Sequence, residues 1–227
     1  MTSLLFAGRA RPVVPIVGLD AVFPVGRILC VGRNYAAHRR EMGGDDRDPP
    51  FFFAKPADAV VIGGAPAPYP SRTDDLHHEI ELVVAIGAAG ESVAPSAALD
   101  LVYGYAIGVD LTRRDLQAVA KAKGQPWDAA KGFDHSAPIS DILPWTGPPP
   151  RGRIALSVNG EPRQGADLDD MIWSVAEVVS EASALWRLEP GDLIFTGTPE
   201  GVGPLQRGDR VTGEIEGLGQ LSFDIGP

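Results

Sequence analysis

Cysteine is almost missing from this 227-residue sequence, and long apolar runs are missing as well. Cys30 is the single cysteine, so no disulfide can form within the chain. No apolar run comes near the roughly 18 residues that a membrane helix needs, and no basic segment followed by a long apolar stretch opens the sequence. We therefore expect a cytoplasmic protein with no membrane partner. Because Cys30 stands within an apolar stretch, we expect it to be an inert core thiol.

Basic residues are in the minority. The chain has 20 Lys and Arg against 30 Asp and Glu, a formal net charge of −10, and no segment gathers the basic residues into a stripe. The phosphate backbone of a nucleic acid would be repelled overall, so we expect no nucleic-acid partner. An anionic small substrate is still compatible with this charge, because a metal ion or a few local cations can reverse the field inside a pocket.

Several widespread catalytic motifs are absent. The sequence has no G-x-S-x-G elbow, no G-x-x-x-x-G-K-[ST] loop, and no G-x-G-x-x-G after a strand, so nucleotide-dependent chemistry loses its usual support. His77-His78-Glu79 begins like a zinc-protease helix, but the position where a second histidine ligand would stand is Leu82.

Glycine and proline are plentiful, with 27 and 21 residues, while 44% of the residues are hydrophobic and 22% are charged. This composition is typical of a globular protein with many turns and short strands. No repeat, low-complexity tract or long linker divides the chain, so we expect a single domain over residues 1–227.

The hydrophobic periodicity predicts many strands and few helices. The predicted strands are 28–31, 79–86, 102–109, 154–158, 161–164, 193–196, 211–215 and 221–225, and the predicted helices are 35–42, 112–123 and 172–186. Asn34 suits the N-cap of the first helix, and Thr112 with Asp115 resembles a capping box. Asn159-Gly160 predicts a type I′ hairpin turn. Strand and helix do not alternate regularly, so we expect a strand-dominated α+β fold with mixed sheets.

Three carboxylates draw attention within apolar surroundings. Glu79 and Glu81 share one face of the predicted strand 79–86, and Asp110 ends the apolar run 102–109. The pair could be the solvated outer face of an edge strand, and Asp110 could be a helix cap. Alternatively, the three carboxylates form a hard oxygen site suited to Mg²⁺ or Mn²⁺ rather than Zn²⁺.

Other polar residues occur at helical spacing. His38 and Glu41 lie three apart in the predicted helix 35–42, which matches a carboxylate that orients a general base, or a simple surface pair. Arg114 and Gln117 share a face of the next helix, and Lys131 lies in a Lys-Gly-Phe-Asp turn. Taken singly, each of these residues fits a solvated surface group better than a catalytic one.

Together, six ordered segments resemble the fumarylacetoacetate hydrolase superfamily. They are Cys30–His38, His77–Glu81, Gly104–Asp110, Leu111–Gln117, Ala130–Asp134 and Thr196–Gly203, and the match runs from about Phe23 to Ile225. The chain is similar to the small single-domain acylpyruvate hydrolases of this superfamily. Phe51–Asp58 and the segment through Pro126-Trp127-Asp128 resemble the bacterial fumarylpyruvate hydrolases of gentisate breakdown.

The resemblance implies a mixed β-roll or sandwich, usually a homodimer, with Mg²⁺ or Mn²⁺ held by Glu79, Glu81 and Asp110. It also implies that the segment 33–50 is a lid carrying the catalytic dyad His38 and Glu41.

For the substrate, the resemblance implies that Arg114, Gln117 and Lys131 bind the pyruvoyl end and that Thr198 lies near its carboxylate. Lys131 and Gln117 are then also candidates to stabilise the oxyanion during catalysis. A second carboxylate at the acyl end would need a local cation in a protein of net charge −10. Arg33 and Arg40, at the start of the lid segment and within it, are the nearest candidates.

The activity implied is the metal-dependent hydrolysis of a carbon–carbon bond in a 2,4-diketo acid, with fumarylpyruvate giving fumarate and pyruvate. Two alternatives stay open at this point. Decarboxylation or tautomerisation of oxaloacetate needs the same metal chelate but no hydrolytic water. A non-catalytic metal-binding protein would keep the ligands and show no turnover.

Overall fold

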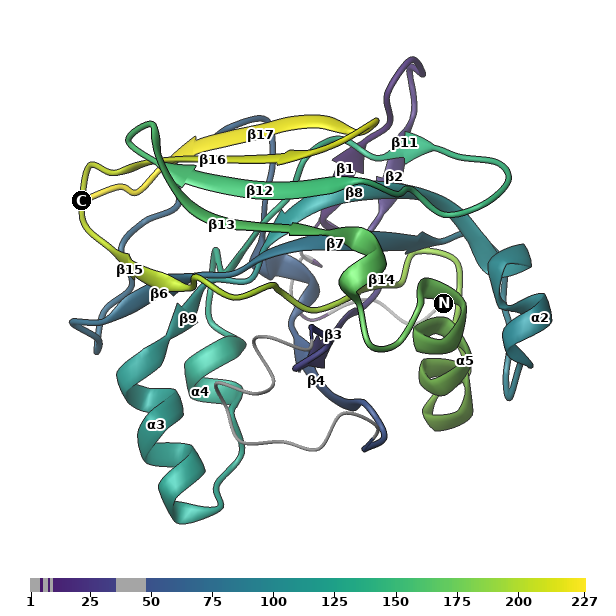
Figure 1. Ribbon diagram of the computed structural model, residues 1–227, viewed down its shortest axis with the longest axis horizontal. Helices are drawn as coiled ribbons and strands as arrows, with labels where there is room; N and C mark the ends of the chain where they lie inside the picture. Colours follow the sequence, from purple (N-terminus) through teal and green to yellow (C-terminus); the bar gives the residue numbers. More distant parts are fainter. Residues whose placement is uncertain (1–4, 6–7, 9, 36–47) are drawn as a thin grey trace.

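The computed structural model describes residues 5, 8, 10–35 and 48–227. Two sheets, one of six strands and one of four, lie over each other, and the helices gather at the sides and below (Figure 1). The six-stranded sheet has the order β11 (Leu143–Pro144), β8 (Val102–Val109), β7 (Ile80–Ile86), β14 (Leu193–Phe195), β3 (Ile28–Gly32) and β4 (Phe51–Lys55). The four-stranded sheet has the order β13 (Glu161–Asp167), β12 (Arg153–Val158), β16 (Arg210–Ile215) and β17 (Gly219–Asp224).

Three small sheets complete the strands. They are β15 (Gly203–Leu205) with β6 (Leu76–His78) and β9 (Thr112–Arg113), β1 (Val13–Pro15) with β2 (Val22–Pro24), and β5 (Val60–Val61) with β10 (Ala137–Pro138). The named strands pair antiparallel except β14 with β3 and β10 with β5, which are parallel. The expected strand-dominated α+β fold with mixed sheets is therefore confirmed.

Strand β7 lies between β8 and β14 and is buried along its whole length. Ile80, Leu82, Val84 and Ile86 belong to the core between the two large sheets, which the apolar residues of β12 and β16 share. On the opposite face, Val83 and Ala85 pack into a second core that also contains Cys30. The interpretation of 79–86 as a solvated edge strand is therefore wrong, and Cys30 is a buried thiol as predicted.

The helices are short. They are α2 (Pro95–Ala98), α3 (Arg114–Lys123), α4 (Asp128–Lys131) and α5 (Val175–Leu185), with 3₁₀ turns η1 (Ala57–Ala59), η2 (Leu99–Leu101) and η3 (Leu168–Asp170). Helices α3 and α4 lie together below one end of the sheets, and α2 and α5 lie at the other end (Figure 1). None of the helices among the described residues is long and apolar enough to span a bilayer.

Two predicted helix starts are wrong. Thr112 belongs to β9, and α3 begins only at Arg114, while Asp115 accepts a hydrogen bond from the Thr73 hydroxyl at 2.6 Å. The helix predicted from position 172 begins at 175, because Ser174 and Glu177 form a capping box there. The predicted helix 35–42 lies outside the described residues except for its first position.

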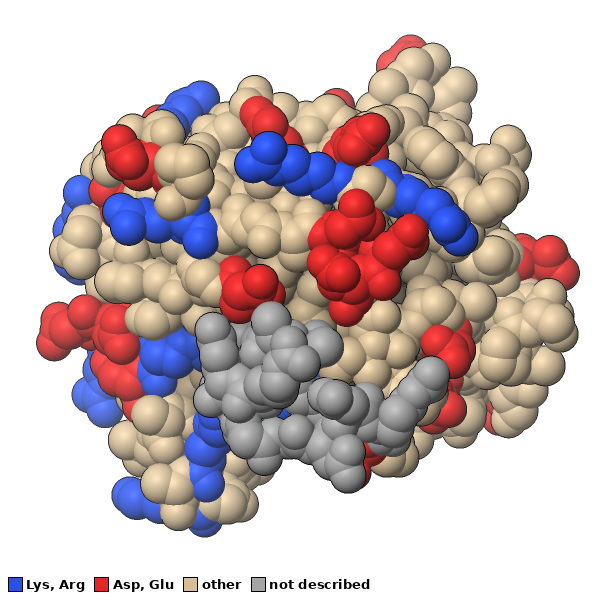
Figure 2. All heavy atoms as spheres, in the orientation of Figure 1, with Lys and Arg blue, Asp and Glu red and all other residues tan. Residues whose placement is uncertain are grey.

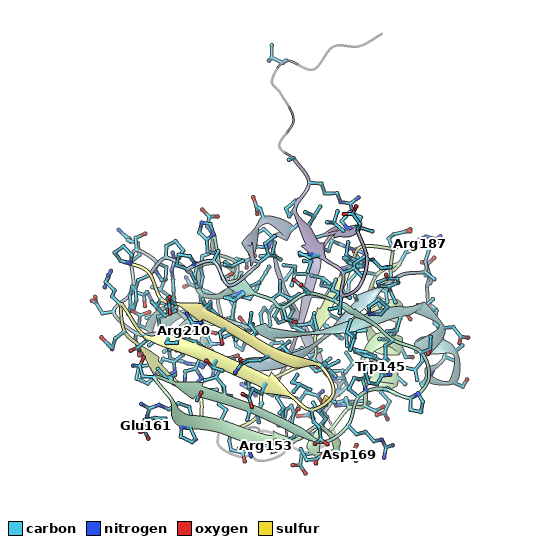
Figure 3. The ribbon with its side chains drawn as sticks, turned by 90° about the horizontal axis from the view of Figure 1, so that it is seen from above. Trp145, Arg153, Glu161, Asp169, Arg187 and Arg210 are labelled. Carbon is cyan, nitrogen blue, oxygen red and sulfur yellow. The ribbon has the colours of Figure 1, made fainter. Side chains whose placement is uncertain are left out.

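The predicted hairpin at Asn159-Gly160 is confirmed. Both residues have positive φ angles, 53° and 82°, as a type I′ turn requires, and β12 and β13 pair on either side. Seen from above in Figure 3, this hairpin forms one side of the four-stranded sheet, with Arg153 and Glu161 toward its opposite ends. On the face shown in Figure 2, acidic and basic side chains lie beside one another despite the net charge of −10.

Candidate metal centre and active site

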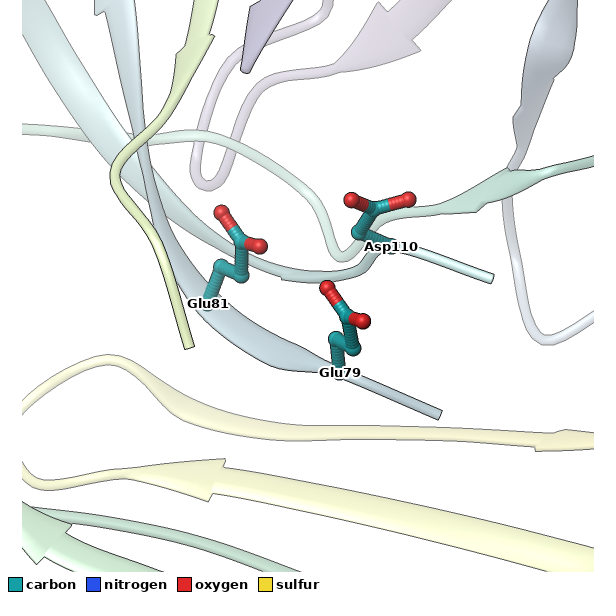
Figure 4. A group of neighbouring side chains, drawn as sticks. All are labelled: Glu79, Glu81 and Asp110. Carbon is teal, nitrogen blue, oxygen red and sulfur yellow. The ribbon is translucent and has the colours of Figure 1, made fainter. Parts of the chain in front are cut away.

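Glu79, Glu81 and Asp110 come together because two neighbouring strands begin and end at the same place. Strands β7 and β8 are antiparallel, with Ile80 opposite Val109, so the residue before β7 lies beside the residue after β8. The backbone N–H of Asp110 donates to the Glu79 carbonyl at 2.8 Å. One carboxylate oxygen from each of the three residues lies within 4.8 Å of the others, around a common centre (Figure 4).

The three carboxylates are buried, with exposed fractions of 6% for Glu79, 1% for Glu81 and 0% for Asp110. Burial raises the pKa of Glu81 well above its usual value, and the neighbouring carboxylates of Asp110 and Glu79 raise it further. Asp110 lies four residues before the first residue of α3, so the interpretation as a helix cap is also wrong. With the solvated edge strand and the helix cap excluded, the remaining interpretation is that the three carboxylates are oxygen ligands.

Two of the predicted residues, Lys131 and Arg114, place cations against the carboxylates. Lys131 Nζ lies 2.8 Å from Glu79 and 2.6 Å from Asp110, and Arg114 Nη2 lies 2.6 Å from Glu79. Burial alone would lower the pKa of Lys131, but the carboxylates of Asp110 and Glu79 outweigh it, so the pKa is raised. Lys131 therefore keeps its positive charge at the centre of the cluster.

Lys55 is a member of this cluster that the sequence reasoning missed. Its Nζ lies 2.7 Å from Asp110, with both side chains fully buried, and it donates to the Leu111 carbonyl at 3.1 Å. The available signal was a lysine that ends the apolar strand β4, where a solvated charge would be out of place. Lys55 thus holds both the carboxylate and the backbone that follows it.

The residues present fit Mg²⁺ or Mn²⁺. Glu81 accepts a hydrogen bond from the Gly197 N–H at 2.7 Å, and no ion pair joins Glu81 to Lys or Arg within the part of the chain that the structure describes. Gly197 has a φ of +99°, and a side chain there would meet Asn34 at 2.7 Å. A buried carboxylate without its own cation, beside two further carboxylates, is a suitable set of oxygen ligands for a hard divalent cation.

A cavity opens beside the cluster, and the predicted substrate residues surround it. Its lining consists of Val31, Gly32, Arg33, Phe53, Glu79, Glu81, Arg114, Gln117, Trp127, Lys131 and Thr198. Arg114 Nη1 donates to Gln117 Oε1 at 2.6 Å, so these two residues share a helix face as predicted. The structure thus brings Arg33, Arg114, Gln117 and Thr198 to one cavity, while the role of each toward a substrate stays a prediction.

The end of the cavity near Arg33 is aromatic. Trp127 packs edge-on against Phe51, with ring centroids 5.1 Å apart, and lies 5.9 Å from Phe53. The Arg33 guanidinium lies 5.9 Å from the Phe51 ring centre, and Lys121 Nζ lies 5.9 Å from that of Trp127. Trp127 and Lys121 were not predicted as site residues, although Trp127 stands within a segment that carried the family resemblance.

The predicted dyad His38 and Glu41, together with Arg40, lies outside the described residues, so its placement stays a prediction. Asn34, just before that segment, is fully buried. Its side-chain amide donates to the Trp173 carbonyl at 2.9 Å and the Thr196 carbonyl at 2.8 Å, and its oxygen accepts from the Trp173 N–H. The start of the predicted lid segment is therefore tied to the loop that carries Gly197.

Comparisons with known proteins agree with this geometry. A family model described as fumarylacetoacetate (FAA) hydrolase C-terminal matches residues 27–225. A fumarylpyruvate hydrolase of Ralstonia sp is 46% identical over 178 residues, covering 78% of this chain and 93% of the relative.

A crystal structure of fumarylpyruvate hydrolase from Pseudomonas aeruginosa, in complex with Mn²⁺ and pyruvate, is 52% identical, with a TM-score of 0.95 and 99% of each chain covered. A mitochondrial oxaloacetate tautomerase of Arabidopsis thaliana is 44% identical, covering 88% of this chain and 90% of the relative.

Proposed function

The chain belongs to the fumarylacetoacetate hydrolase family, and from this premise we propose that it is a metal-dependent acylpyruvate hydrolase that cleaves fumarylpyruvate to fumarate and pyruvate. The observation that carries the proposal is the buried cluster of Glu79, Glu81 and Asp110 with the Lys131 ammonium against it. The relatives named fumarylpyruvate hydrolases support the choice of substrate.

Glu79, Glu81 and Asp110 would hold the cation, which when bound supplies Lewis acidity for the negative charge that develops on the pyruvoyl oxygens. Residues of the chain bind the substrate, stabilise its negative charge and transfer protons. Arg114 and Gln117 present hydrogen-bond donors to the pyruvoyl carboxylate from the first turns of α3.

Lys131 stays protonated between two carboxylates and stabilises the oxyanion and the departing enolate. His38, oriented by Glu41, would deprotonate the attacking water. The water adds to the acyl carbonyl carbon, the bond from that carbon to C3 breaks, and the electron pair stays on the pyruvate enolate, which then takes up a proton.

The far end of the cavity suits the fumaryl group. A planar conjugated chain can pack against Trp127 and Phe53, and its second carboxylate would come close to Arg33 and Lys121. Partial desolvation of its ammonium lowers the pKa of Lys121, and the positive charges of Arg33 and Arg114 lower it further. A carboxylate bound there would offset this repulsion between cations, which supports a dianionic substrate.

Oxaloacetate tautomerisation is the second candidate, because relatives 41% to 44% identical are named oxaloacetate tautomerases. This reaction would use the same cation and Lys131 but no attacking water. Purified protein loaded with Mn²⁺ and given fumarylpyruvate, acetylpyruvate and oxaloacetate separately tests both, with products followed by proton NMR. We expect fumarate and pyruvate to form fastest. Turnover of oxaloacetate alone would reject the hydrolase proposal in favour of the tautomerase.

Three broader features belong to the same proposal: a homodimer, a cytoplasmic location and a place in gentisate breakdown. Size-exclusion chromatography with light scattering tests the first, and a monomeric mass at assay concentrations would contradict it. The exposed apolar residues Val17, Leu19 and Val22, on and beside the β1–β2 hairpin, support an interface between copies.

A further inference from the structure

Gln164 is a polar residue that reaches the cavity region from the other sheet. It lies on β13, and it is the one residue of that strand that is fully buried, with 3% of its surface exposed. Neither its spacing nor its surroundings in the sequence singled it out. Its carboxamide lies between the start of β7 and the loop at Thr198, which are separate parts of the site.

Two backbone contacts fix which way the carboxamide points. The Ile80 N–H, which can only donate, lies 3.1 Å from Oε1, and the Pro199 carbonyl, which can only accept, lies 2.9 Å from Nε2. His78 Nδ1 lies 2.8 Å from the same Oε1 and donates to it. The amide group is therefore a donor on the side that faces Thr198.

This orientation determines what the Thr198 hydroxyl can do. Gln164 Nε2 donates to Thr198 Oγ1 at 2.8 Å, so the hydroxyl oxygen is the acceptor in that bond and its proton points elsewhere. Among the described residues no acceptor takes this proton, and Thr198 lines the cavity beside Glu81 and Lys131. The hydroxyl is thus left as a donor toward whatever anion enters.

We propose that Gln164 is a positioning residue: it presents the Thr198 hydroxyl as a hydrogen-bond donor to the carboxylate of a bound 2-oxo acid. Through Ile80, it also holds that donor at a set distance from β7, which carries Glu81 and directly follows Glu79. The proposal rests on the proposed function for the identity of the ligand, since a 2-oxo acid is the part shared by all the substrates considered.

The substitution Gln164→Glu tests the proposal because it replaces the Nε2 donor with an oxygen acceptor of the same size. The Thr198 proton would then turn toward the new carboxylate and away from the cavity. We expect the KM for fumarylpyruvate and the Kd of pyruvate for the Mn²⁺-loaded protein to rise by about 10- to 100-fold, with a smaller fall in kcat.

A variant that carries both substitutions shows whether Gln164 acts through Thr198 or independently of it. Thr198→Val should raise the same constants by a similar factor, and Gln164→Glu combined with Thr198→Val should be no worse than Thr198→Val alone. Gln220→Glu is the matched control, because Gln220 is exposed on β17 and its amide donates only to the exposed Glu214 among the described residues. That control should leave both constants unchanged.

A merely structural role predicts a different result. If the effects of Gln164→Glu and Thr198→Val multiply, or if only the melting temperature falls while KM and the pyruvate Kd stay unchanged, the proposal is overturned. Gln164→Met is the second variant, uncharged and of similar length, and should reproduce part of the pyruvate effect. Failure of both Gln164 variants to fold would likewise assign the residue to structure rather than positioning.

Pyruvate binding by calorimetry separates this proposal from the proposed function. A wild-type protein that binds pyruvate without hydrolysing any acylpyruvate would reject the hydrolase while leaving the Gln164 effect measurable. If the protein hydrolyses an acylpyruvate but its Kd for pyruvate is unchanged by Gln164→Glu, only the positioning role is rejected.

Discussion

The two ends of the cavity are built differently. At the carboxylate end, Glu81, Asp110 and Lys131 are at most 2% exposed, and each is held by a strand, a strand end or a short helix. At the aromatic end, Arg33 and Trp127 are half-buried, and Lys121, which lies beside Trp127 rather than in the cavity wall, is exposed. At the first end, the charges are buried together and the placement of each depends on the others. At the second end, the side chains make individual ring and cation contacts that do not depend on one another in this way. Substitutions should therefore be severe and non-additive at the first end and graded at the second.

The largest effect is expected for Asp110→Asn. The substitution removes one of three oxygen ligands and leaves both Lys55 and Lys131 without their shared carboxylate partner. We expect Mn²⁺ binding measured by calorimetry to be lost and kcat/KM to fall by about 10³-fold or more. Asp100→Asn, an exposed aspartate on η2, is the control. Normal turnover by Asp110→Asn after treatment with a chelator would remove the metal from the proposal.

Lys131→Met comes next. It keeps the length of the side chain but removes the ammonium between Glu79 and Asp110, where charge develops during the reaction. We expect kcat to fall by about 10²- to 10³-fold while Mn²⁺ still binds, since the three carboxylates remain. Single-turnover kinetics and Mn²⁺ titration measure the two quantities. A loss of metal binding equal to the loss of kcat would make Lys131 part of the structure of the site and not of the chemistry.

At the aromatic end, Arg33→Met and Lys121→Met should each lower kcat/KM for fumarylpyruvate by about 1–2 kcal/mol, roughly 5- to 30-fold. Acetylpyruvate, which lacks the second carboxylate, should change little. Lys123→Met, exposed near the end of the same helix, is the matched control. Equal losses on both substrates for both variants would refute recognition of a distal carboxylate here.

The smallest effect concerns the pH dependence of stability without metal. Burial raises the pKa of Glu81, so the folded state binds this proton more tightly than the unfolded state. The contribution of Glu81 to the free energy of unfolding must therefore fall as the pH rises from about 4.5 through the raised pKa. We expect the melting temperature of the metal-free protein, measured relative to Glu81→Gln, to decrease over this range by a few degrees.

Adding Mn²⁺ should raise the melting temperature of the wild-type protein and remove this pH trend, because the cation binds the ionised carboxylate. Glu81→Gln should respond weakly to Mn²⁺. If Mn²⁺ leaves the melting temperature of the wild-type protein unchanged at every pH, this result would count against a formed metal site.

Local patterns were sufficient where the chemistry is local. The strand over 102–109 and the Asn159-Gly160 turn agree with the structure because a short continuous apolar run and a pair of residues that favours positive φ angles need no distant partner to be recognised. The start of the helix at 175 was missed by three residues. The Ile172 N–H donates to the Asn34 carbonyl, a contact 138 positions away that sequence periodicity does not contain.

The sequence by itself determined which groups were available: three carboxylates in apolar runs, and arginine, glutamine and lysine in motifs typical of one family. Only the tertiary structure decided that Glu81 is buried rather than solvated, since this depends on β7 lying between β8 and β14. It also places Lys55 of β4 and Gln164 of β13 at the site. The lysine that ends an apolar strand was a weak local signal for Lys55, and Gln164 had none. The physical reason is that burial and pairing depend on which strands become neighbours, and that is a property of the whole chain.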